Sequence, residues 1–168
     1  MAQLAERVRE QIVELLPRLR RFARTIARHR EDADDLVQIT VERALLRSDQ
    51  WRPDSPLESW LFGIMKNAWI DEVRARVRRD RVLAPEEAGA HVGEHSHEQQ
   101  VHSLSIEAAM AELPDEQRMA VGLVLVEGLS YKEAAGVLEI PIGTLTSRLA
   151  RGRETLAAML SESEGDVR

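Results

Sequence analysis

Apolar residues recur at i, i+3, i+4, i+7 and i+11 through residues 57–79, which is the spacing of an amphipathic helix. The stripe consists of Leu57, Trp60, Leu61, Ile64 and Ala68. Similar patterns predict helices over residues 3–29 and 32–47. We expect Pro17 to divide or kink the first of these helices, because proline lacks the amide that an interior turn needs.

The second half of the chain shows four shorter helical patterns, separated by turn residues. Gly128 is expected to cap the end of one helix, and Ser130 with Glu133 forms a capping-box pattern at the start of the next. The predicted helices are 105–112, 115–126, 130–138 and 142–160.

Between the two halves the periodicity is lost, and prolines, glycines and histidines replace it, which predicts a flexible linker. We therefore expect an all-α protein with two small helical domains. The expected boundaries are a first domain at 1–81, a linker at 82–104, a second domain at 105–161 and a tail at 162–168.

The composition agrees with this fold class. The chain has 168 residues, only 4% of them aromatic, and is rich in the helix formers Ala, Leu, Glu and Arg. It has no cysteine, which excludes disulfides and cysteine-rich metal sites, and no apolar run approaches the length of a membrane span. Charges occupy residues 1–10, where a signal peptide would be apolar. These features predict a cytoplasmic protein that does not insert into membranes.

The net charge of −6 is unevenly distributed. Residues 82–112 hold six glutamates and no lysine or arginine, so the rest of the chain is balanced. Cations gather in three groups, at 18–30, 66–81 and 148–153. For nucleic-acid binding, local basic faces of this kind matter more than the net charge of the chain. The negative net charge therefore does not exclude binding to DNA.

Residues 127–153 read as two helices joined by a tight turn. In the second helix, one face carries short hydroxyls and long cations at i, i+3, i+4 and i+7, and these are Thr144, Ser147, Arg148 and Arg151. A solvated helix face is the alternative, but the two-helix context favours a helix-turn-helix that reads the major groove of DNA.

The stretch 113–156 resembles region 4 of extracytoplasmic-function (ECF) sigma factors of RNA polymerase. It contains the family's Leu-Pro, Glu-Gly, Ser-Tyr-x-Glu-x-Ala, Pro-x-Gly-Thr and Ser-Arg-Leu patterns. The resemblance implies recognition of minus-35 promoter duplex. Thr146 stands where many members have a cation. The expected contact residues are Thr144, Thr146, Ser147, Arg148, Arg151 and Arg153.

The segment Asp34-Asp35-Leu36-Val37-Gln38 resembles the region 2 motif of the same family, which implies a helix that binds core RNA polymerase. Ile39 replaces a glutamate that is common in the family. Charge balance at the helix N-terminus also accounts for the aspartates. The expected polymerase-binding residues are Asp34, Asp35, Gln38, Ile39 and Leu45.

The helix after Trp60 resembles family regions 2.3 and 2.4, which capture the melted minus-10 element. An amide and a carboxylate can read an extruded base, and cations can follow phosphates. Trp60 is expected in the core, and Trp69 either in the core or as a stacking platform. The expected minus-10 residues are Arg52, Asp54, Ser55, Asn67, Asp71, Arg74 and Arg78.

The resemblance implies a sigma factor that binds core RNA polymerase and promoter DNA, with an anti-sigma factor as a further partner. We expect no cofactor, no enzymatic activity and no metal site, although His91, His95, His97 and His102 lie in the linker. Two other interpretations are a sigma-like adaptor or decoy that binds a regulator, and a helix-turn-helix repressor. We also expect the free protein to bind DNA weakly. Its two DNA-binding interfaces are modest, and they gain affinity from each other only when polymerase holds both at the promoter spacing.

Overall fold

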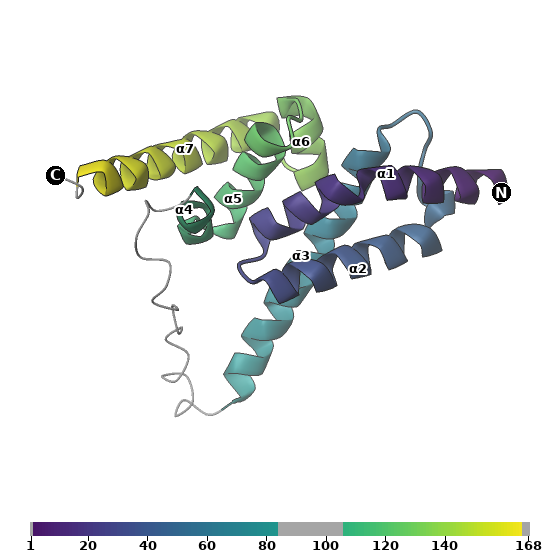
Figure 1. Cartoon of the computed structure of the whole chain (residues 1–168), viewed down its shortest axis with the longest axis horizontal. Helices are drawn as coiled ribbons and strands as arrows, with labels where there is room; N and C mark the ends of the chain where they lie inside the picture. Colours follow the sequence, from purple (N-terminus) through teal and green to yellow (C-terminus); the bar gives the residue numbers. More distant parts are fainter. Residues whose placement is uncertain (1, 84–105, 166–168) are drawn as a thin grey trace.

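The computed structural model describes residues 2–83 and 106–165, and these residues contain helices and no strands. Figure 1 shows them as two groups, which we call the N-terminal module (2–83) and the C-terminal module (106–165). The N-terminal module contains α1 (Ala2–Ile26), α2 (Arg30–Leu46), the 3-10 turn η1 (Ser48–Gln50) and α3 (Leu57–Val82). The C-terminal module contains α4 (Ile106–Glu112), α5 (Asp115–Val121), the π-helical segment η3 (Gly122–Val126), α6 (Tyr131–Leu138) and α7 (Ile142–Gly165).

The first helix is continuous through Pro17. Of the two expected effects of this proline, a division or a kink, division is therefore wrong. Pro17 is exposed, and so is Val13, whose carbonyl the missing amide would have bonded. That carbonyl lies on the side of α1 that faces solvent, where water can replace the lost helical bond. The opposite side of α1 carries Val8, Ile12, Leu19, Phe22 and Ile26 into the core.

The turns of the C-terminal module follow the predicted chemistry. Ser130 caps α6, and its hydroxyl oxygen accepts the amide of Glu133 at 3.1 Å. Gly128 has a φ of 73°, which a glycine adopts without strain. Glu139 ends α6 with a φ of 54°, a left-handed conformation in a non-glycine residue that the sequence did not reveal.

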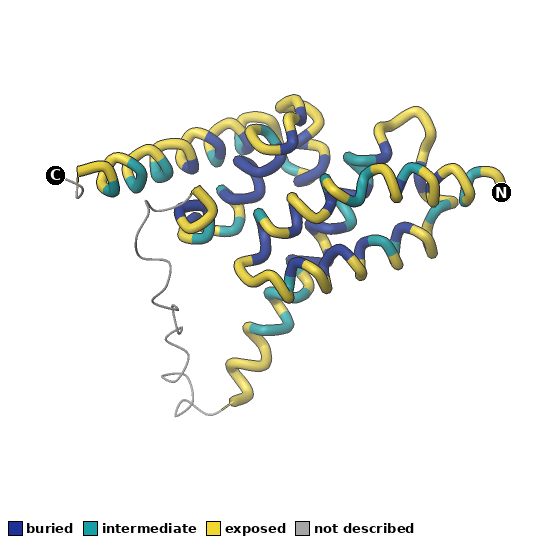
Figure 2. The backbone as a smooth tube through the Cα atoms, in the orientation of Figure 1, coloured by how far each residue is buried: buried dark blue, intermediate teal, exposed yellow. Residues whose placement is uncertain are grey.

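The two modules pack against each other. One cluster of buried apolar side chains includes Phe22 and Phe62 from the N-terminal module together with Leu123, Ala134 and Leu145 from the C-terminal module. Figure 2 shows buried positions running without a break from α1 and α3 into α5 and α6. A smaller cluster of Met110, Leu113, Val121 and Leu149 lies inside the C-terminal module. The linker predicted at 82–104 lies almost entirely outside the described residues.

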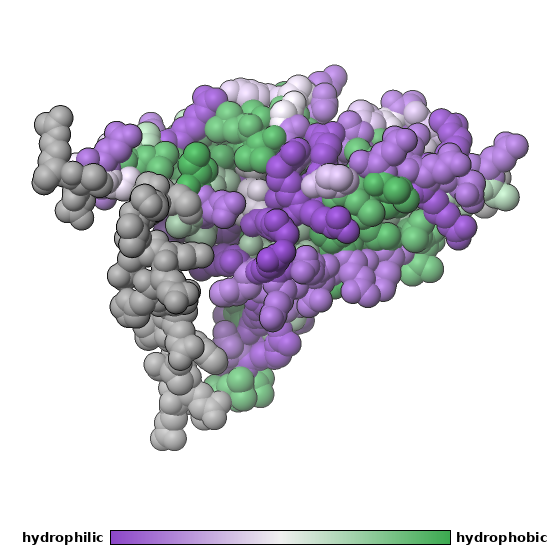
Figure 3. Space-filling model, viewed as in Figure 1, coloured by the Kyte–Doolittle hydropathy of each residue, from purple (hydrophilic) through white to green (hydrophobic). Residues whose placement is uncertain are grey.

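None of the helices in the described parts of the chain is long and apolar enough to cross a membrane. Hydrophilic residues cover much of the face in Figure 3, and apolar surface appears over the helices α1 and α2.

Candidate nucleic-acid and polymerase interfaces

The residues predicted to contact minus-35 DNA lie along α7. Leu145 and Leu149 are buried and attach this helix to the module, which turns the opposite side outward. The hydroxyls of Thr146 and Ser147 donate to the carbonyls one turn earlier, at 2.9 and 3.1 Å, and both residues are exposed. Arg151 and Arg153 are also exposed, whereas Thr144 and Arg148 are half-buried.

One of these cations has an acidic neighbour. The guanidinium of Arg148 lies 3.6 Å from the carboxylate of Glu116 on α5, and the Glu116 side chain is 71% exposed. A pair this open to water contributes little energy. Arg148 can therefore exchange its carboxylate for a phosphate or a base edge at small cost.

The residues predicted for the minus-10 element lie on α3 and on the loop before it, and all seven are exposed. The loop is fixed from inside, because the buried Trp51 donates its indole N–H to the carbonyl of Ser55 at 3.2 Å. The Ser55 hydroxyl and amide both bond the carbonyl of Arg52. On α3, the carboxylate of Asp71 lies 3.5 Å from Arg43 of α2.

The tryptophans of α3 belong to the packing of the N-terminal module. Trp69 is 5% exposed, and the Arg76 guanidinium lies 5.6 Å from the centre of its ring. Hydrogen bonds to Asp32 and then to Glu72 raise the pKa of Arg76. In this conformation Trp69 is a core residue and does not offer a stacking surface. Trp60 is half-buried against the same core, as expected.

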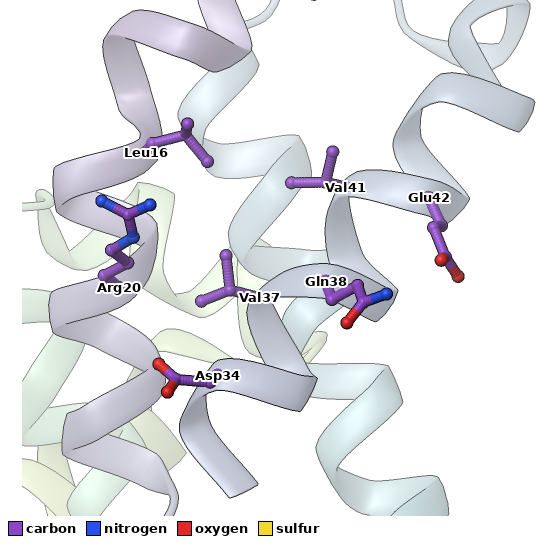
Figure 4. A pocket seen from close by; sticks show the side chains of 7 residues that line it. All are labelled: Leu16, Arg20, Asp34, Val37, Gln38, Val41 and Glu42. Atoms are coloured by element: carbon purple, nitrogen blue, oxygen red, sulfur yellow. The ribbon is translucent and has the colours of Figure 1, made fainter. Parts of the chain in front are cut away.

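A groove of about 390 Å³ separates α1 from α2. Figure 4 shows its walls, with Leu16 and Arg20 on α1 opposite Asp34, Val37 and Gln38 on α2. Val41 and Glu42 complete the lining. The groove thus has an apolar floor and charged rims, a surface suited to a partner helix.

The groove contains only part of the predicted polymerase-binding set. Asp34 and Gln38 line it, whereas Asp35, Ile39 and Leu45 are exposed on α2 outside it. Five residues of the groove lining were not among the predicted binding residues. Leu16 and Arg20 lie on the other helix, and no local motif links them to α2; the others are Val37, Val41 and Glu42.

Among the described residues, no group of three or more His, Asp or Glu side chains is placed to hold a metal ion. The four linker histidines lie outside these residues, so the structure does not test that expectation.

Comparison with known proteins agrees with the arrangement of two modules. Residues 12–66 match the family model described as the Sigma2 domain of PhyR, and residues 103–156 match the model for Sigma-70, region 4. The ECF RNA polymerase sigma factor EcfG of Rhodopseudomonas palustris is 34% identical over 157 residues, which cover 94% of this chain and 87% of that protein.

Two solved structures share the fold over almost the whole chain. The sigma factor RpoE of Bartonella quintana, crystallised with the anti-sigma factor NepR, has a TM-score of 0.77 and 31% identity. The match covers 91% of this chain and 96% of RpoE. CnrH in complex with the cytosolic domain of CnrY has a TM-score of 0.69 and 27% identity, over 96% and 94% of the two chains. The chain therefore belongs to the ECF family of RNA polymerase sigma factors.

Proposed function

We propose that this protein binds core RNA polymerase and directs promoter-specific initiation of transcription. In this assignment α7 binds minus-35 duplex, and α3 with the 52–55 loop holds the melted minus-10 strand. The groove between α1 and α2, together with the exposed residues of α2, binds the polymerase. RNA polymerase then carries out RNA synthesis. Because that enzyme works in the cytoplasm, this protein would act there too.

The exposed side of α7 is the observation that carries this proposal. Its two innermost leucines are held in the core, so the hydroxyls of Thr146 and Ser147 and the guanidinium of Arg151 share the surface of one rigid helix. Short hydroxyls allow close approach to the DNA backbone, and arginine bonds guanine edges or phosphates. A helix that only needed to be solvated would not require this combination.

Reconstituted transcription tests the proposal. The purified chain and core polymerase should give promoter-specific run-off RNA from genomic fragments. Arg151→Ala should weaken initiation that depends on the minus-35 element, by about 1–3 kcal/mol at one base position for a guanine contact, or evenly across sequences for a phosphate contact. Arg7→Ala is the matched control, because Arg7 is also an exposed helical arginine but lies outside the proposed surfaces. Equal effects of the two substitutions would refute the assignment of α7.

Asp35→Ala tests the polymerase surface separately. It should weaken binding to core polymerase and leave the affinity for minus-35 duplex unchanged, since Asp35 lies on α2 and the duplex surface on α7. Intact binding to core polymerase would show that docking uses another surface.

The alternative function is that of an adaptor that binds a regulator without starting transcription. The solved structures of RpoE with NepR and of CnrH with CnrY favour keeping it, because each shows a protein of this fold bound to a protein partner. An anti-sigma factor is a proposed partner under either function, since RpoE is solved with NepR. The run-off assay separates the two, because an adaptor gives no promoter-specific RNA.

A further inference from the structure

A fully buried carboxylate joins the two modules. The side chain of Glu127, just after η3, has no exposed surface. Arg21 of α1 donates from Nε to one carboxylate oxygen at 2.8 Å and from Nη2 to the other at 2.7 Å. Arg18 adds Nε at 3.3 Å and also donates to the Glu127 backbone carbonyl at 2.9 Å. The hydrogen bonds to Glu127 raise the pKa of Arg21, as expected for a guanidinium held by a carboxylate.

A second ion pair crosses the same interface. The ammonium of Lys66 on α3 lies 3.2 Å from the carboxylate of Glu139, which occupies the left-handed turn between α6 and α7. The Lys66 side chain is only 6% exposed, whereas that of Glu139 is 77% exposed. Lys66 is adjacent in sequence to Asn67, one of the residues proposed to bind the melted strand.

The apolar part of the interface is tightly packed at one point. Phe22 and Phe62 meet edge to face, with ring centres 4.9 Å apart, and Gly122 of η3 packs beside Phe22. A Cβ atom on Gly122 would stand 2.9 Å from the γ-methyl of Thr25. Any larger residue at position 122 would therefore act as a wedge between the modules.

The charged part is poorly suited to holding the modules permanently. Burying a lysine or a carboxylate costs desolvation energy that an ion pair only partly recovers, and well-packed apolar residues are often as stable or better. The ion pairs therefore add little net stability to the apolar cluster that the two modules share. Arg18 and Arg21 also belong to a run of α1 that includes Arg20 and Arg24 and has no acidic residue. Arg18 lies 3.6 Å from Glu58 of α3, and Glu127 of the C-terminal module is the carboxylate that both arginines hydrogen-bond.

A guanidinium fork that binds a carboxylate through two parallel hydrogen bonds fits a phosphate equally well. We propose that Glu127 and Glu139 act as a latch that holds the protein closed, and that opening frees Arg18, Arg21 and Lys66 from these carboxylates as a binding site for nucleic-acid phosphates. The proposal rests on the proposed function in taking nucleic acid as the ligand. In the closed form the two carboxylates occupy the places of phosphates.

The absence of cysteine makes the opening measurable. Spin labels attached through Asp49→Cys and Glu162→Cys, both exposed, report the distance between the modules by pulsed electron paramagnetic resonance. Glu127→Gln removes the buried charge with little change of shape, and Arg21→Gln removes its main partner. Both should shift the distance distribution to longer values. Gly122→Val should do the same without any change of charge, and Gly136→Val is its control, because no atom lies within 4 Å of a Cβ at that exposed helical glycine.

A fluorescent single-stranded oligonucleotide then tests the phosphate site. Glu127→Gln frees Arg21 and leaves Arg18 only its pair with Glu58 at 3.6 Å. Each additional phosphate contact should steepen the dependence of log affinity on log salt by about 0.7. At 0.1 M salt, one to three contacts correspond to a gain in affinity of roughly five- to a hundredfold. Arg21→Gln opens the same interface but removes a cation, so it should gain less than Glu127→Gln.

Three results would overturn the latch and its site. These are an unchanged distance distribution in both Glu127→Gln and Gly122→Val, an oligonucleotide affinity in Glu127→Gln equal to that of the original protein, and equal gains for Glu127→Gln and Arg21→Gln. Neither measurement contains polymerase, so run-off transcription judges the proposed function independently. A chain that initiates transcription but stays closed refutes the latch alone, and a chain that opens but never initiates refutes the proposed function alone.

Discussion

Gly152→Ala is expected to destabilise the C-terminal module, because α7 has no room for a side chain where it crosses α5. Gly152 is buried, and a Cβ atom there would stand 2.7 Å from a γ-methyl of Val121 and 3.6 Å from the Cβ of Gln117. Carbon atoms pack well at about 3.5–4.0 Å, so one of the two helices has to shift.

The magnitude follows from two opposing terms. Overpacking a tight core costs about 1–3 kcal/mol, while alanine is about 1 kcal/mol better than glycine inside a helix. The net change is a loss of about 0–2 kcal/mol in the free energy of unfolding. Gly136→Ala receives only the favourable term, because no atom lies within 4 Å of its Cβ. The two variants should therefore differ by about 1–3 kcal/mol, which is the overpacking term alone.

Urea denaturation followed by far-ultraviolet circular dichroism measures both variants under identical conditions. Adding Val121→Ala to Gly152→Ala removes the clashing methyl groups, so the double variant should lose less stability than the sum of the single losses. If Gly152→Ala proves as stable as Gly136→Ala, or if the double variant shows simple additivity, the close approach of α5 and α7 is not what limits this position.

Three further expectations concern stability. Arg118→Met should cost about 2–3 kcal/mol, because the buried carbonyl of Leu113 and the part-buried carbonyl of Ala111 lose their guanidinium donor; an unchanged melting temperature would contradict this. Thr40→Val should cost less than about 1 kcal/mol, because the carbonyl that accepts the buried hydroxyl also lies within the hydrogen-bonded interior of α2; a loss above 2 kcal/mol in urea denaturation would show that the hydroxyl matters more. All three tryptophans lie in residues 51–69, so fluorescence reports on the N-terminal module, whereas circular dichroism reports on the helices of both modules. Because the two modules share a core, both signals should change at the same urea concentration. Separate midpoints would show that the modules unfold independently.

The helices of the chain are largely predictable from periodicity, and their ends are less so. The expected helices at 57–79 and 142–160 extend to Val82 and Gly165, because the first helix-stopping residues after the expected ends are Pro85 and Gly165. The continuous path through Pro17 depends on which side of α1 faces solvent. The π-helical segment and the positive φ of Glu139 arise from packing against neighbouring helices, which no local pattern encodes.

The proposed binding surfaces are likewise predictable only in part from the sequence. Exposure of Arg151 on α7 and of Asn67 on α3 follows from helical periodicity, since the opposite positions are apolar. The groove itself was not predicted, although Asp34 and Gln38 of its lining were expected to bind polymerase; its other wall is α1, which no local motif links to α2. The contact of Arg18 with Glu127 joins residues 109 positions apart, and neither residue carries a local sign of the other.

The closed form constrains the order in which the proposed surfaces can act. The groove lined by Asp34 and Gln38 is open, and so is the side of α7 that carries Arg151, whereas Lys66 is covered by the C-terminal module. Polymerase can therefore bind α2 before the modules separate, and separation affects the cations beside the melted-strand surface. The closed form pairs Arg18, Arg21 and Lys66 with carboxylates, so we expect the free protein to bind single-stranded DNA weakly. Any partner that binds across both modules would hold this state, and any partner that separates them would release the three cations together.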